Sequence, residues 1–235
     1  MNTRSKVQQM ASSSSKVLVF DVETTGLLPQ KPRNSTQQIP LSEYPHIIQL
    51  SFAVYDLNNN RLVRTYDSYV KIDATIEINE YVSKLTGITP EICNNSGNCI
   101  TEVLKEFYMA YMECKAIVAH NMDFDEKMIL IELERNREQM IPLVPDYTTL
   151  FNKVREETSG IERYCTMRKG ITLCNIMVES KIPGKPARAK WPKLAELYAK
   201  LFDGEIVDGM HNSMVDVMAC LRCYLKMRHG YHMEK

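Results

Sequence analysis

Short apolar runs separated by polar turns predict the first strands of this chain. Residues 16–20 form one such run, rich in β-branched side chains, which predicts a buried strand ending at Asp21. Further strands are predicted over 46–56 and 61–72, with an asparagine turn at 58–60 between them, because asparagine tolerates left-handed backbone angles. Together the three strands predict an antiparallel meander.

Helical spacing dominates the rest of the chain. Apolar residues recur at helical intervals over 101–114, and 123–138 is amphipathic with acids in its first turn. The short apolar run 116–119 between them predicts a fourth strand. Segment 146–190 suggests a short helix, a strand near 164–166 and then a loop, and two more helices are expected over 191–202 and 212–228. This order predicts an α/β fold, with a mixed sheet flanked by helices.

Composition and charge change this picture little. Of 235 residues, 44% are hydrophobic and 25% charged, which is typical of a globular protein and excludes a wholly disordered chain. The net charge of zero excludes strong attraction of the whole molecule to nucleic acid or membrane, although a local basic patch stays open. We expect a mobile polar tail over 1–15 and one domain over 16–230, with the proline-rich loop 28–45 either functional or mobile.

The chain also lacks signals for export or membrane insertion. No run reaches about 18 apolar residues, and the N-terminus has no apolar signal-peptide core. Seven scattered cysteines are an odd number, which favours reduced thiols inside the cell, in the cytoplasm or nucleus. Cys220 and Cys223 form a CxxC without a second ligand pair, so we interpret them as structural.

Acidic residues gather at the edges of three apolar elements. Asp21 and Glu23 lie two residues apart in a strand, so they point to one face and repel each other unless a cation lies between them. Asp123 and Asp125 follow the strand 116–119, where helix capping is the simpler alternative for one of them.

The third segment opens the last predicted helix. Asn212 or Ser213 could cap that helix, which leaves His211 in the loop before it and Asp216 in its first turn. Taken singly, the three segments fit a strand end, a helix cap and a surface histidine. Together they predict a site with several carboxylates and one base, suited to Mg²⁺ or Mn²⁺ rather than zinc. Two such ions about 3.5–4 Å apart can clamp an in-line phosphoryl displacement.

These segments resemble the motifs of a known enzyme family. FDVETTG at 20–26, AHNMDFD at 119–125 and HNSMVD at 211–216 are similar to the three motifs of DnaQ-like 3′–5′ exonucleases of the DEDDh type. VSKLTGIT at 82–89 resembles the segment between the first two motifs. The resemblance spans about residues 16–228 and implies a ribonuclease H-like mixed sheet, with an antiparallel meander plus parallel strands, flanked by helices.

The resemblance also implies the chemistry of the site. It implies two divalent cations, Mg²⁺ or Mn²⁺, and four acidic metal ligands, namely Asp21, Glu23, Asp125 and Asp216. His211 is then the base that takes a proton from the attacking water, and the product is a nucleoside 5′-monophosphate. Asp123 departs from the plain pattern, and we expect it to cap the helix while Asp125 is the ligand.

Substrate contacts are expected at two places. The first is the turn and pocket beside the terminal nucleotide, although ordinary turn chemistry and core packing explain these residues equally well: Thr24, Thr25, Gly26, Leu27, Asn121 and Phe124. The second is the basic stretch 181–193, which has five basic residues and no acid and can contact a polyanionic backbone through Lys185, Arg188 and Lys190.

Three functions stay open at this point. The leading one is a 3′–5′ exonuclease on single-stranded or frayed 3′ ends of DNA or RNA. An exoribonuclease or oligoribonuclease is the second, because metals grip phosphate and do not read the sugar. A catalytically silent binding or scaffolding protein with this fold is the third. A polymerase or another replication or repair factor is a candidate partner, and no membrane partner is expected.

Overall fold

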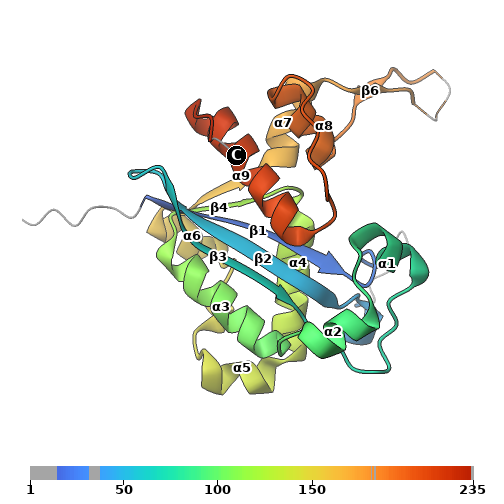
Figure 1. Cartoon of the computed structure of the whole chain (residues 1–235), viewed down its shortest axis with the longest axis vertical. Coiled ribbons are helices and arrows are strands. Elements are labelled where there is room, and N and C mark those ends of the chain that lie inside the picture. Colours follow the sequence, from blue (N-terminus) through green and yellow to red (C-terminus); the bar gives the residue numbers. More distant parts are fainter. Residues whose placement is uncertain (1–14, 32–37, 181, 183, 234–235) are drawn as a thin grey trace, which may run out of the picture.

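A five-stranded mixed sheet forms the centre of the molecule (Figure 1). The computed structural model describes residues 15–31, 38–180, 182 and 184–233. The strands lie in the order β3-β2-β1-β4-β5; β1 pairs antiparallel with β2 and parallel with β4, β2 is antiparallel to β3, and β4 is parallel to β5. Their bounds are β1 Lys16–Thr24, β2 Ile47–Asp56, β3 Arg61–Tyr69, β4 Ala116–Ala119 and β5 Glu162–Cys165. The predicted mixed sheet is confirmed.

Strand β1 contributes to two separate cores because alternate side chains point to opposite faces of the sheet. Leu18 and Phe20 pack against α3 (Ile100–Glu113), α4 (Met122–Arg135) and α5 (Arg137–Leu143). Val17 and Val19 pack on the other face against α8 (Leu194–Leu201) and α9 (Ser213–His229). A strand covered on both faces reads as a continuous apolar run, which is why the sequence predicts it well.

Several short elements were not predicted. α1 (Glu80–Thr86) and α2 (Pro90–Ser96) cover a small third core that includes Ile72 and Ile88. The expected long helix 123–138 is divided into α4 and α5. After α6 (Lys153–Ser159), the region expected to be loop contains α7 (Thr166–Cys174) and a hairpin of β6 (Met177–Val178) and β7 (Arg188–Ala189). The single turns η1 and η2 cover Leu41–Glu43 and Tyr147–Thr149.

The long loop after β1 is anchored where the structure describes it. The guanidinium of Arg135, in the last turn of α4, donates hydrogen bonds to the carbonyl oxygens of Leu41 and Pro45, both at 2.7 Å. Residues 38–46 are therefore fixed against α4. Residues 32–37 of this loop and residues 1–14 of the expected tail lie outside the described part of the chain.

The structure also describes the cysteines and the character of the helices. All seven cysteines are free, and Cys220 and Cys223 are buried in α9 within the second core. Within the described ranges, no helix combines the length and the apolar character that a bilayer crossing requires.

Candidate active site

The site forms at the end of β1, where that strand extends beyond its neighbour β4. β4 pairs with β1 at Val17 to Val19. Further along, the backbone N–H of Val22 donates to Oδ1 of Asp125 at 3.1 Å. Asp125 is buried in the first turn of α4, which begins directly after β4. This bond ties the Asp125 carboxylate to the backbone between Asp21 and Glu23.

A second set of hydrogen bonds fixes the start of α9 to the sheet. The hydroxyl of Ser213 donates to the carbonyl oxygen of Asp21 at 2.7 Å, and its N–H donates to Oε1 of Gln49 at 3.2 Å. Nε2 of Gln49 in turn donates to Oδ1 of Asp67 on β3 at 2.8 Å. This chain of bonds, from β3 through β2 to α9, positions the residues on either side of Ser213.

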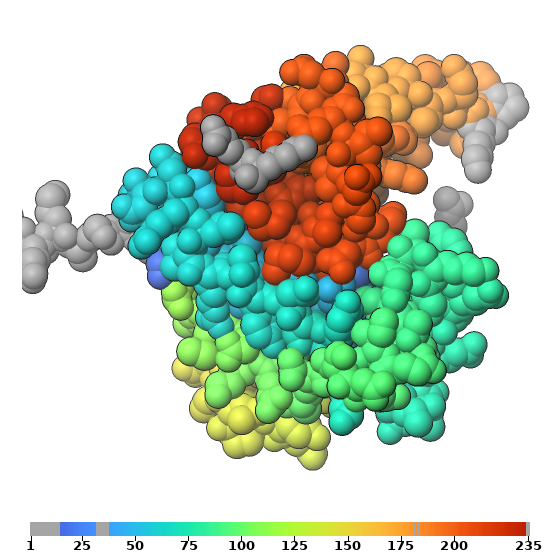
Figure 2. All heavy atoms as spheres, in the orientation of Figure 1, coloured from blue at the N-terminus to red at the C-terminus, as the bar shows by residue number. Residues whose placement is uncertain are grey.

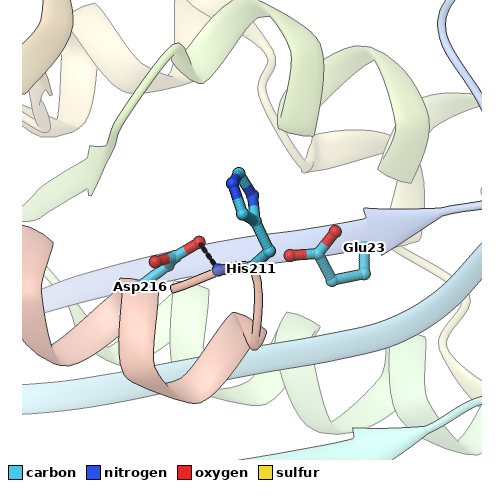
Figure 3. A group of neighbouring side chains, drawn as sticks. All are labelled: Glu23, His211 and Asp216. Carbon is cyan, nitrogen blue, oxygen red and sulfur yellow. Dashed lines mark hydrogen bonds between the residues drawn. The ribbon is translucent and has the colours of Figure 1, made fainter. Parts of the chain in front are cut away.

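His211 and Asp216 lie on either side of that anchor. The N–H of His211 donates to Oδ2 of Asp216 at 3.2 Å, and His211 has a left-handed φ of 70°. Figure 3 shows the imidazole between the carboxylates of Glu23 and Asp216, and ligand atoms of the three residues lie within 4.8 Å of one another. A non-glycine residue held at positive φ is strained, which is common at functional sites.

The carboxylates of the site hold their protons more tightly than free carboxyls do. Burial, and then the charge of Asp216, raises the pKa of Glu23 to about 8. Burial raises the pKa of Asp216 to about 6, although the His211 N–H opposes this rise. Burial raises the pKa values of Asp21 and Asp125 well above the ordinary value; neighbouring carboxylates raise both further, while the Val22 N–H opposes the rise at Asp125. Four acids share a space in which they cannot all be charged without compensation.

These donors fit a divalent cation. Oδ1 of Asp216 is buried and has no hydrogen-bond partner among the described residues. A buried oxygen of this kind is expensive unless something binds it. Carboxylate oxygens are the hard ligands that Mg²⁺ and Mn²⁺ prefer. Bound positive charge would also relieve the repulsion between the acids.

The residues predicted to contact the terminal nucleotide differ in whether their side chains are free to reach a ligand. The hydroxyl of Thr24 donates to the carbonyl of Gly26 at 2.6 Å, and the hydroxyl of Thr25 accepts from the N–H of His46 at 3.0 Å. Both threonines therefore hold the turn itself. Leu27 is 86% exposed and Asn121 is also exposed. Phe124, the last of this set, is half-buried and packs against the first core.

Asp123 does not cap α4, so that expectation is wrong. The N-cap residue is Asn121, which has a left-handed φ of 68°. Asp123 lies in the first turn, is exposed, and pairs with Arg168 of α7. Two residues apart on a helix, Asp123 and Asp125 point in different directions, one to solvent and one into the site.

The described part of the basic stretch runs from the turn of the β6–β7 hairpin through β7 to the start of α8. Figure 2 shows the hairpin projecting from the body at the upper right. Lys185 and Arg188 are exposed, and neither forms an ion pair with another residue that the structure describes. Lys190 instead donates to Glu196 at 2.6 Å, so its charge is already partly compensated.

The sequence analysis missed Gln49 and Ser213 as positioning residues. The available signal was a polar side chain inside an apolar strand, since β2 is buried over Ile47–Tyr55 and yet contains Gln49 and Ser51. A buried polar group needs a partner, and here the partner is the first residue of α9.

A mixed sheet in this strand order, with acids gathered at the end of its central strand, defines a protein of the ribonuclease H-like class. Comparison with known proteins then gives the family. The family model described as "Exonuclease" matches residues 18–224, so the chain belongs to this exonuclease family and carries a DnaQ-like 3′–5′ exonuclease domain.

Relatives of the chain are much longer proteins. The PolC-type DNA polymerase III of Thermotoga petrophila is 31% identical over 118 residues, which are 50% of this chain and 7% of that protein. The PolC-type polymerase of Streptococcus sanguinis is 29% identical over 127 residues, 54% of this chain and again 7% of the relative. The chain therefore spans only a small part of the length of these relatives.

Solved structures of exonuclease I share the fold. E. coli exonuclease I in complex with a dT13 oligonucleotide superposes with a TM-score of 0.61 at 18% identity, over 92% of this chain and 42% of that one. A zinc-bound form of the E. coli enzyme with single-stranded DNA gives 0.60 at 16% identity, over 92% and 41%. At these identities the likeness establishes the fold alone.

Proposed function

We propose that this chain is a metal-dependent 3′–5′ exonuclease that hydrolyses the terminal phosphodiester bond of DNA or RNA and releases nucleoside 5′-monophosphates. One observation carries the proposal: four acids from β1, α4 and α9 converge beside one histidine. They are Asp21, Glu23, Asp125 and Asp216, with mutual electrostatic effects on their pKa values. Membership of the exonuclease family supports the same reaction.

The same four carboxylates would hold two divalent cations, Mg²⁺ or Mn²⁺. When bound, such cations supply positive charge that lowers the pKa of the attacking water and offsets negative charge on the phosphate. The unpartnered oxygen of Asp216 and the raised pKa of Glu23 support this assignment.

His211 would act as the base that accepts a proton from the water. Its side chain is exposed, so it can return that proton to solvent after each turnover. The bond from its backbone N–H to Asp216, together with the anchored start of α9, fixes where the imidazole stands. The backbone around His211 would thus orient the base.

The substrate would enter with its 3′ end at the turn after β1. Leu27 and Asn121 are exposed beside the site and can contact the terminal nucleotide, while Thr24 and Thr25 shape the turn and Phe124 supports it from the core. The exposed cations Lys185 and Arg188, with Lys190 in a lesser role, would contact the backbone of a single-stranded or frayed end. The PolC relatives support a polymerase, or another replication or repair factor, as a partner.

Oligonucleotides labelled at the 3′ or the 5′ end test this function. With Mg²⁺ or Mn²⁺, a 5′-labelled strand should shorten stepwise while a 3′ label is released at once as mononucleotide, and chelator should stop both. Parallel DNA and RNA strands decide the sugar preference. Asp125→Asn should abolish the activity and its neighbour Asp123→Asn should retain it. Intact strands with folded, metal-loaded wild-type protein would refute the proposal.

A further inference from the structure

Trp191 is a large exposed aromatic residue whose chain neighbour, Pro192, is hydrogen-bonded to His120 of the second motif. It is the only tryptophan of the chain, and its side chain is 63% exposed. It lies where the hairpin returns to α8, between Lys190 and Pro192. Tryptophan is usually well buried. Within the described part of the chain, no contact of Trp191 explains why it is exposed.

The backbone next to Trp191 is held by His120, which lies five residues before the site acid Asp125. This histidine directly follows the last residue of β4, and Nε2 of its ring lies 3.1 Å from the carbonyl oxygen of Pro192. Nδ1 lies 3.0 Å from the hydroxyl of Thr166. Burial lowers the pKa of His120 to about 4, so the ring is neutral; Nε2–H donates to the carbonyl and Nδ1 accepts from the hydroxyl.

Pro192 is also packed from the other side. It is buried, and a Cβ built on Gly170 of α7 would meet its Cγ at 3.2 Å. The close approach of α7 therefore depends on glycine at that position. Held by a hydrogen bond and by this packing, Pro192 gives Trp191 a fixed base from which its ring extends into solvent.

The charge around Trp191 indicates what would bind its ring. Lys185, Arg188 and Lys193 are exposed along the same stretch, which contains no acid between 181 and 193. A ligand that matches both features is a polyanion with free flat faces. Single-stranded nucleic acid combines phosphates with unpaired bases, whereas the bases of a duplex are already stacked.

We propose that Trp191 stacks on an unpaired base of the substrate strand, upstream of the terminal nucleotide, while Lys185 and Arg188 contact the phosphates. The inference rests on the proposed function, because it takes the bound strand to be the substrate. It goes further in naming the residue that would make this chain select single-stranded over blunt duplex ends. Loss of one base stack weakens binding by about 5- to 100-fold.

The single tryptophan is itself a probe of this contact. The titration uses the Asp216→Asn variant, which prevents turnover. Saturating single-stranded DNA or RNA should change the tryptophan emission of this variant, and a saturating blunt duplex should not. Saturation is followed independently through the anisotropy of a dye on the oligonucleotide. Unchanged emission at saturation overturns the proposal, and this measurement needs no substitution at Trp191.

Kinetics give the second arm of the test. Trp191→Ala should raise KM for single strands by about 5- to 100-fold with little change in kcat, and Trp191→Phe should recover most of the loss. The control Val154→Ala removes apolar surface from a residue that is 70% exposed on α6, which precedes β5, whereas Thr166 of the Trp191 anchor follows that strand. A KM within twofold of wild type for Trp191→Ala, or an equal rise for duplex and single strand, overturns the proposal.

A small substrate distinguishes failure of the stacking proposal from failure of the proposed exonuclease function. Thymidine 5′-monophosphate p-nitrophenyl ester fills only the terminal position, so Trp191→Ala should hydrolyse it at the wild-type rate. If wild type does not cleave either this ester or oligonucleotides, the proposed function fails, while the emission titration still reports whether Trp191 binds a strand. If both substrates are cleaved and Trp191→Ala changes nothing, only the stacking proposal fails.

Discussion

Neutralising Glu23 should stabilise the metal-free protein at alkaline pH. Burial and the charge of Asp216 raise the pKa of this carboxyl from 4.5 to about 8 in the folded state. Between these two values the folded protein binds more protons than the unfolded chain does. The free energy of unfolding must therefore fall as the pH rises from about 4.5 to about 8. Glu23→Gln removes the charge that has to form in that interval.

The size of the effect follows from the pKa. One proton changes the free energy of unfolding by about 1.4 kcal/mol per pH unit, so the full interval gives at most about 5 kcal/mol. Glu23 is only half-buried, and solvent screening reduces this to about 2–3 kcal/mol. For a domain of this size that is about 4–12 °C in Tm.

Thermal unfolding in chelator from pH 5 to pH 8 measures this directly. Wild type should lose about 4–12 °C over that range, and Glu23→Gln should lose clearly less and be the more stable protein at pH 8. Glu157→Gln, at an exposed position of α6, is the control and should follow wild type. Mn²⁺ at pH 8 should raise the Tm of wild type more than that of Glu23→Gln. An equal Tm at pH 5 and pH 8 for metal-free wild type would show that folding does not raise the pKa of Glu23, and would refute the reasoning.

Three further changes test separate parts of the site. Gln49→Leu removes the hydrogen bonds that join β3 to the start of α9. It should lower kcat more than it raises KM, and urea titration should show a loss of about 1–3 kcal/mol in the free energy of unfolding. An unchanged kcat would contradict the positioning role. His211→Ala should lower kcat by about 10²- to 10⁴-fold with the Tm nearly unchanged, because the side chain is exposed. The pair Lys185→Ala and Arg188→Ala should raise KM and flatten its salt dependence, whereas Lys153→Ala on α6, which precedes β5, should do neither.

Elements with a long or fully buried pattern could be predicted from the sequence. β4 occupies Ala116–Ala119 as expected, and α3 and α9 each differ from their predicted limits by one residue. The helices α1 and α2 were missed because each has seven residues and one fully buried side chain, Val82 or Cys93, so no periodic pattern develops. α7 and the hairpin were missed because polar residues and turns interrupt every apolar run there.

The site likewise has a part that the sequence predicts and a part that it does not. Motif spacing was enough to bring Asp21, Glu23 and Asp125 to one place. Asp21 and Glu23 lie at the end of one strand, and Asp125 comes shortly after the end of another. The hydrogen bond between Ser213 and Gln49 joins residues 164 positions apart, and no local pattern encodes it. The pairing of Asp123 with Arg168 of α7 is also long-range, which is why a local capping argument assigned the wrong role to that acid.

The existence of the site depends on one topological detail, the shortness of β4. If β4 continued alongside β1, its carbonyl groups would take up the N–H of Val22, and Asp125 could not reach the backbone between Asp21 and Glu23. Because β4 turns into α4 after Ala119, the end of β1 stays open on that side. The opening admits the acid from α4 and, under the proposed function, the substrate. The repulsion among the acids destabilises the end of β1, and the burial of β1 in two cores offsets that destabilisation.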